Sequence, residues 1–219
     1  TISYANTTYC TSITTSEAVT INGTNAYQGG TYSAAPTGLD INPTTGAITP
    51  SASNAGIYTV TYTIPASAGC AAGSATTQVT ITAAPTATIS YANTPYCTSI
   101  TTSQAITLNG TNAYQNGTYT VNPTGLTLDA ATGAITPSTS TAGTYTVTYS
   151  IPASAGCAAG SATTQVTITA TPTATISYAN TPFCTSITTS EAVTINGTNA
   201  YQNGTYTVSP AGLTLDAAT

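Results

Sequence analysis

The chain has no Lys, Arg, His, Met or Trp among its 219 residues, and five carboxylates are its only charged side chains. A chain without cations cannot neutralise phosphates, which excludes nucleic acid as a partner and removes any attraction to anionic lipid headgroups. No run of 18 apolar residues occurs, so we also expect no membrane insertion. Thr, Ser and Asn must therefore supply the solubility that charged side chains usually give.

One segment of sequence is repeated along the chain. The heptapeptide T-I-S-Y-A-N-T begins at Thr1, Thr88 and Thr175. We call residues 1–87 the first module, residues 88–174 the second, and residues 175–219, which match the N-terminal half of the others, the third. The two complete copies differ at 18 positions. Repetition at a fixed period predicts an array whose function depends on length or number rather than on one active site.

The sequence gives no sign of catalysis or of a cofactor. A Ser or Thr nucleophile would have no His or Lys as its base. The carboxylates are interchangeable between copies, because Glu17 is matched by Gln104 and Asp129 by Asn42. We therefore expect solvated turn residues, no enzyme activity and no cofactor. Neither linker between modules carries a carboxylate, which leaves Asp40 with Asn42 as the best candidate for calcium, and a weak one.

Alternating side chains predict the strands. In residues 143–151 apolar and Thr or Ser residues alternate, which is typical of a half-buried strand. The apolar face consists of Tyr145, Val147, Tyr149 and Ile151, and Tyr58, Val60, Tyr62 and Ile64 repeat it in the first copy. Residues 162–169 would be the partner strand, with Val166 and Ile168 inward. With turn signals throughout, this predicts an all-β fold of tandem antiparallel sandwiches, about seven strands per module.

Two segments carry a family resemblance. Residues 125–135, G-L-T-L-D-A-A-T-G-A-I, followed by residues 142–147, A-G-T-Y-T-V, resemble the immunoglobulin-like repeats of large bacterial cell-surface adhesins. The Cys placement is similar to that of tandem repeats in gliding and adhesion proteins of Bacteroidota. The resemblance implies immunoglobulin-like sandwiches and an extracellular or cell-surface adhesin or stalk. Tyr145 would match the tyrosine corner of such sandwiches. With no leader before Thr1, we expect an internal piece of a larger secreted protein.

Each complete module contains two cysteines, 60 residues apart, and 27 residues separate the last cysteine of one module from the first of the next. We predict intramodule disulfides, Cys10 with Cys70 and Cys97 with Cys157, and a partner for Cys184 outside the chain. In a sandwich the two positions lie nominally at opposite ends, so this pairing requires residues 5–17 to fold back along a sheet edge. Counting leaves open the alternative of Cys70 with Cys97. Metal binding is not expected, since no His or second nearby Cys completes a site.

Three functional hypotheses follow. In the first, Pro-containing linkers make the array a stiff spacer whose partners are neighbouring repeats of the same protein. In the second, the modules self-associate into filaments, because an uncharged surface lacks the charges that normally prevent pairing of strand edges. In the third, Thr rows order ice-like water or exposed tyrosines bind glycans; the candidate ligand contacts are Tyr27, Tyr114 and Tyr201.

Overall fold

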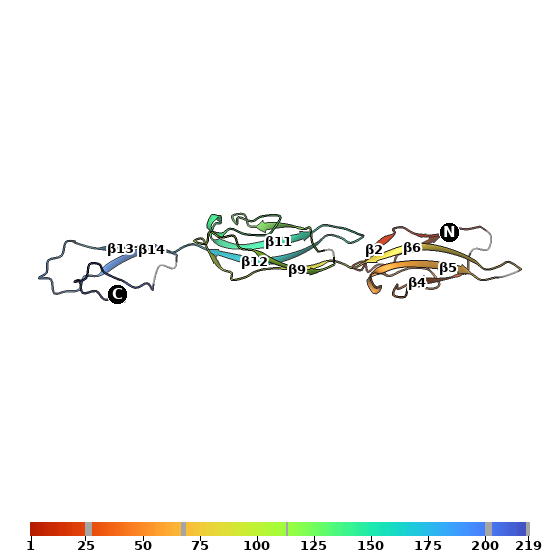
Figure 1. Cartoon of the computed structure of the whole chain (residues 1–219), viewed down its shortest axis with the longest axis horizontal. Coiled ribbons are helices and arrows are strands. Elements are labelled where there is room, and N and C mark those ends of the chain that lie inside the picture. The colour runs from red at the N-terminus through yellow and green to blue at the C-terminus, as the bar shows by residue number, and fades with distance from the viewer. Residues whose placement is uncertain (25–27, 67–68, 113, 200–202, 218–219) are drawn as a thin grey trace.

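The computed structural model describes residues 1–24, 28–66, 69–112, 114–199 and 203–217. It is an extended rod in which the three modules follow one another along one axis (Figure 1). The N terminus lies in one end module and the C terminus in the other. In the part of the chain that the structure describes, no helix is long and apolar enough to cross a membrane.

The first two modules have the same strand arrangement. In each, a two-stranded antiparallel sheet faces a four-stranded sheet whose edge strand is added in parallel. The third module contributes one antiparallel pair. The first module contains β1 (Ile2–Tyr4), β2 (Thr8–Cys10), β3 (Val19–Ile21), β4 (Thr31–Ala35), β5 (Gly56–Ile64) and β6 (Gly73–Thr82), with sheets β1-β3 and β2-β6-β5-β4. The second contains β7 (Thr86–Tyr91), β8 (Tyr96–Cys97), β9 (Ile106–Thr111), β10 (Thr118–Asn122), β11 (Gly143–Ile151) and β12 (Gly160–Thr169), with sheets β7-β9 and β10-β11-β12-β8. The third contains β13 (Thr173–Tyr178) and β14 (Val193–Thr198), and short 3-10 turns lie at Pro50–Ala52 and Pro137–Thr139.

The all-β fold predicted from alternation is confirmed, and so is the direction of its central strands. β11 has the predicted bounds and buries its whole apolar face, while β12 buries Val166 and Ile168. In the first module the equivalent face of β5 is buried except for Ile64, which is half-buried. Thr, Ser and Gln side chains take the other face of β11 and β12. Apolar burial on one face is therefore what holds the two sheets together.

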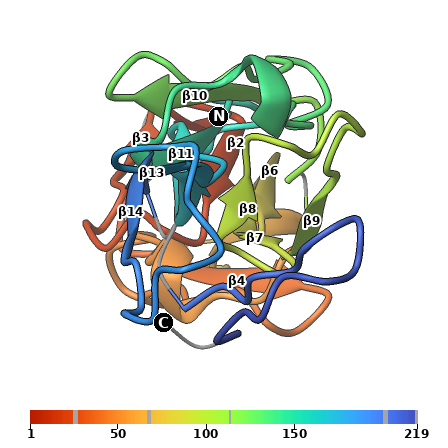
Figure 2. The same cartoon turned by 90° about the vertical axis from the view of Figure 1, so that its left-hand side faces the viewer.

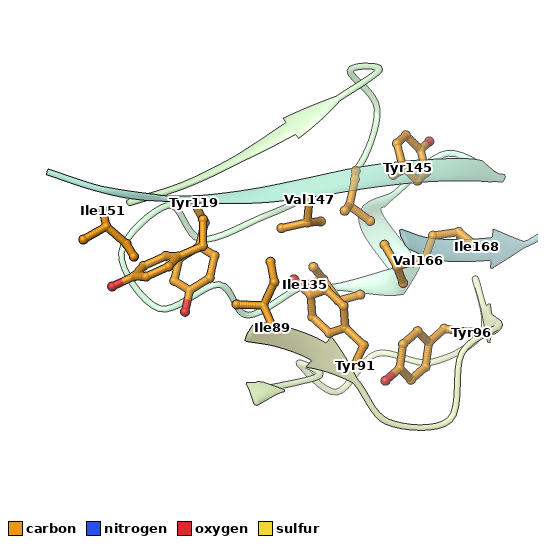
Figure 3. Packing of buried hydrophobic residues seen from close by; sticks show 12 residues of the cluster. Ile89, Tyr91, Tyr96, Tyr119, Ile135, Tyr145, Val147, Ile151, Val166 and Ile168 are labelled. Carbon is orange, nitrogen blue, oxygen red and sulfur yellow. The ribbon is translucent and has the colours of Figure 1, made fainter. Parts of the chain in front are cut away.

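Tyrosines fill much of the core (Figure 3). The rings of Tyr119 and Tyr149 lie 4.7 Å apart between their centroids. The predicted tyrosine corner is confirmed, because the Tyr145 hydroxyl donates a hydrogen bond to the carbonyl oxygen of Thr141 at 2.7 Å. Tyr145 thus contributes a large apolar surface to the core while its hydroxyl keeps a polar partner.

The strand count differs slightly from the expected seven. Among the described residues each complete module has six strands, and Ile48 in the first module and Ile135 in the second form only isolated bridges outside them. β2 and β8 were not predicted as strands, and they pair in parallel with the end of the last strand of their module. Their two or three residues are too few for a period-two pattern to be visible.

Successive modules are turned relative to each other about the long axis. Seen along the rod, β4 of the first module lies at the bottom and its counterpart β10 at the top (Figure 2). The β11–β12 end of the second module points toward the first module, near β2 (Figure 1). This arrangement brings together two chain segments that are distant in sequence.

Candidate functional site: the joint between the first two modules

The first half of the joint is the end of the first module. β2 lies against the last residues of β6, with Cys10 opposite Thr82, and the Cys10 side chain is completely buried. The Thr11 backbone N–H extends this pairing by donating to the Thr82 carbonyl oxygen at 2.9 Å. A short parallel strand therefore fixes the position of Cys10 at the end where the chain leaves the module.

The second half of the joint is the hairpin between β11 and β12, residues 152–159. Ser154 and Cys157 exchange backbone hydrogen bonds of 3.1 and 2.8 Å, and Gly156 between them has a φ of +80°. The hairpin places Cys157 next to Cys10, and the two form a disulfide with a Cα–Cα distance of 4.7 Å. The bond joins residues 147 apart in sequence. In the chain-entropy description, closing a loop of that length stabilises the folded pair of modules by about 5 kcal/mol.

The predicted disulfides are wrong, and so is the alternative between Cys70 and Cys97. The predicted pairing with a sheet edge occurs at residues 7–11, but it places β2 beside the end of β6, whereas Cys70 lies before Gly73, the first residue of β6. A ten-residue strand spans about 33 Å, far more than a disulfide can bridge. The nearest hairpin to Cys10 is therefore the one in the next module. Cys70, Cys97 and Cys184 form no disulfide in the part of the chain that the structure describes.

Close packing accompanies the covalent bond. A Cβ atom added to Gly156 would lie 2.8 Å from the carbonyl oxygen of Thr8, so only glycine lets the hairpin approach the β2 backbone this closely. The Thr82 hydroxyl donates to the Ala155 carbonyl oxygen at 2.5 Å. The linker is held as well, since the Asn112 side chain donates to the Ala84 carbonyl oxygen at 2.7 Å. Sequence reasoning missed Gly156 and Thr82, although the hairpin is identical in both complete copies.

Two open hollows lie at or beside the joint. One, of about 460 Å³, is lined by linker residues and by the hairpin near Cys157. The other, of about 490 Å³, is lined by Tyr114, Asn112, Gln115, Asn116, Pro152 and Ser154.

The structure describes one of the three predicted ligand-contacting tyrosines. Tyr114 is half-buried and packs against the core of the second module. Its ring covers Gly110, and its carbonyl oxygen accepts a hydrogen bond from the Tyr149 hydroxyl at 2.9 Å. Tyr27 and Tyr201 lie outside the described residues. Ligand binding by any of the three stays a prediction.

Two of the candidate polar groups, the side chains of Asp129 and Asn42, hold equivalent turns in the two complete modules. The Asp129 side chain accepts hydrogen bonds from the backbone N–H groups of Ala131 and Thr132 at 2.9 and 3.0 Å. Both hydrogen bonds lower the pKa of Asp129, and the one from Thr132 has the larger effect. Asn42 makes the same pair of bonds in the first module, so its side-chain oxygen is already engaged. Among the described residues no three His, Cys, Asp or Glu side chains gather as a metal site would require.

No protein-family model matches the chain, and no curated protein matches it. Solved structures with a similar arrangement include Drosophila N-cadherin EC1-4, with 11% identity, a TM-score of 0.39, and coverage of 77% of this chain and 49% of the other. A SusE-like surface-located polysaccharide-binding protein from the Bacteroides thetaiotaomicron heparin utilisation locus has 17% identity, a TM-score of 0.30, and coverage of 77% and 34%. The insect immune protein hemolin has 14% identity, a TM-score of 0.34, and coverage of 72% and 42%. The chain thus spans about half or less of the length of these structures.

Proposed function

We propose that the chain is a structural repeat of an extracellular bacterial adhesin or stalk, acting as a stiff spacer and not as an enzyme. The observation that carries this proposal is the joint, where the linker peptide and the Cys10–Cys157 disulfide are two separate covalent connections between the same two modules. The disulfide also supports an extracellular location, since such bonds persist in oxidising compartments. The resemblance of residues 125–147 to repeats of bacterial surface adhesins supports the class of protein.

Stiffness follows from how the joint resists bending. A single flexible linker would let the modules swing about one point. Here a second connection lies on the hairpin, and Gly156 packs against the backbone of Thr8. Hydrogen bonds from Ala84 to the Thr11 hydroxyl, at 2.9 Å, and from Asn112 to Ala84 hold the linker itself. Bending would have to separate these contacts together.

The surface suits a spacer. Apart from the exposed Ile57 near the start of β5, the outward faces of β5 and β6 carry Thr, Ser and Gln side chains, among them the exposed Thr63, Thr76 and Gln78. These groups are hydrated and uncharged, so they offer no strong attraction to a charged partner. Within this proposal the specific partners of a module are the neighbouring repeats of the same protein.

Small-angle X-ray scattering and electron microscopy of the purified 219-residue chain test the proposal. We expect isolated rods with a narrow distribution of angles between the first two modules. Cys157→Ser should broaden that distribution, while Cys70→Ser, which removes an unbonded thiol, should leave it unchanged. A broad distribution in the unmodified protein would contradict the spacer. Ordered lateral filaments would instead favour self-association, the second hypothesis.

A further inference from the structure

The boundary between the second and third modules repeats one half of the joint. Cys97 lies opposite Thr169, as Cys10 lies opposite Thr82. Two further bonds at this boundary have counterparts 87 residues earlier. The Thr171 backbone N–H donates to the Thr98 hydroxyl at 3.0 Å, as Ala84 does to Thr11 at 2.9 Å, and Asn199 donates to the Thr171 carbonyl oxygen at 2.9 Å, as Asn112 does to Ala84 at 2.7 Å.

The first module carries an unused copy of the other half. Gly69 and Gly156 have nearly the same φ, +82° and +80°. A Cβ on Gly156 would collide with the first module, whereas no atom of the described residues lies within 4 Å of a Cβ on Gly69. Cys70 is exposed, while its counterpart Cys157 is buried and bonded. Gly156 and Cys157 are thus docked on a neighbouring module, whereas their counterparts Gly69 and Cys70 are not.

We infer that one pairing rule holds along the array: the cysteine that each module carries at the position of Cys10, namely Cys10, Cys97 or Cys184, bonds to the hairpin cysteine of the following module. Wherever the 87-residue period continues, Cys97 then bonds to the hairpin of the third module, and Cys70 bonds to a module that precedes it. The partner of each open cysteine is therefore another module of the same type. This inference rests on the proposed spacer function and specifies how its joints are closed.

The chemistry of the open cysteine fits this role. Hydrogen bonds to the Cys97 thiol lower its pKa to about 7; the side chain of Ser99 has the largest effect and that of Thr171 the next largest. Much of Cys97 is therefore in the thiolate form at neutral pH. An exchangeable disulfide such as oxidised glutathione supplies the oxidant. The Cys97 thiolate attacks one of its sulfurs and releases a glutathione thiolate. The hairpin thiolate then attacks Cys97 Sγ, forms the intermodule bond and releases the second glutathione.

Such a series would make the array nearly inextensible. A pulling force would cross each disulfide and then follow only the 27 residues to the next cysteine, as from Cys157 to Cys184. That segment already runs along two modules through β12 and β13. Fully stretched it spans about 90–97 Å, against about 85 Å for two folded modules if each spans a ten-residue strand and its linker. Even with every other strand pulled apart, the array would lengthen by at most about a seventh.

The test keeps the whole 219-residue chain and continues it with a second copy of residues 133–174, which completes the third module. The added copy carries Ala→Ser at the position of the exposed Ala158, so that peptides of the added cysteine differ in mass from those of Cys157. After oxidation in a glutathione buffer, native resistance to thermolysin establishes that this module has folded. Free thiols are then blocked, and pepsin peptides are identified by mass spectrometry without reduction. We expect the added copy of Cys157 to be bonded to Cys97, with Cys10–Cys157 retained and with Cys70 and Cys184 blocked as thiols.

A bond from the added cysteine to Cys184, or Cys97 recovered as a free thiol, would overturn the inference. A second protein carries Gly→Ala at the added copy of Gly156, and we expect at least a severalfold loss of the Cys97 bond with Cys10–Cys157 unaffected. Equal formation of the Cys97 bond would show that it does not depend on docking and would also overturn it. If Cys10–Cys157 forms while Cys97 stays free, the proposed spacer survives and the pairing rule alone fails. If neither forms, both fail.

Discussion

In single-molecule pulling on the two ends of the 219-residue chain, the intermodule disulfide should shorten the contour length to which the chain can be stretched. Force applied at Thr1 and Thr219 reaches Cys10, crosses to Cys157 and continues to the end of the chain. The 147 residues of sequence separation between them carry no load and cannot be extended. At roughly 3.3–3.6 Å per residue, the intact protein should stretch to a contour about 500 Å shorter than the same chain without the bond.

The assay compares three proteins in an optical trap, with handles joined to both termini. Cys157→Ser should gain the full length of about 500 Å, and reduction of the unmodified protein should give the same gain. Cys70→Ser should behave as the unmodified protein, because Cys70 forms no bond. If the disulfides instead closed within modules, each would hide 60 residues, and Cys157→Ser would gain only about 200 Å. That smaller gain, or none, would refute the pairing on which the joint depends.

Three further predictions concern single side chains. Gly156→Ala should lower the yield of the Cys10–Cys157 bond on oxidative refolding severalfold, measured by counting free thiols; Gly69→Ala is the matched control, with the same positive φ but no neighbour to strike, and should leave the yield unchanged. Tyr145→Phe should lower the free energy of unfolding of the second module by about 1 kcal/mol, because the Thr141 carbonyl loses its donor; urea denaturation followed by circular dichroism measures it, and no change would count against the tyrosine corner. Asp129→Asn should destabilise the second module at neutral pH, and the difference in urea midpoint should disappear as the pH falls through the lowered pKa of Asp129, since a depressed pKa stabilises only where the carboxylate is ionised; a difference that persists at pH 2 would contradict this.

Much of the fold could be predicted from alternation because the two central strands of each module are long. β5 and β11 are nine residues each, and their apolar faces pack against a facing sheet, so burial follows the period of two. The role of Asp129 was also predictable, since a carboxylate followed by Ala-Ala-Thr-Gly is typical of a turn. Local patterns of this kind depend on neighbours in sequence, which a single chain displays directly.

The joint was not predictable in the same way, because it depends on how one module sits on the next. β2 is too short to show a period, yet it fixes the end of the module at which Cys10 lies. Spacing between cysteines says nothing of the turn between modules, which brings the β11–β12 hairpin to that end. One signal was present: residues 58–83 change only at Thr63 between the two complete copies, as expected of a segment that must fit its neighbour at every joint.

Disulfide mapping of the unmodified 219-residue chain tests the central claim most directly. Because the chain has no Lys or Arg for trypsin, the digestion uses pepsin, with free thiols blocked beforehand and no reduction. We predict a single linked pair of peptides containing Cys10 and Cys157, with Cys70, Cys97 and Cys184 recovered as blocked thiols. A pair linking Cys10 to Cys70 would contradict the joint, and with it the stiff spacer that the joint supports.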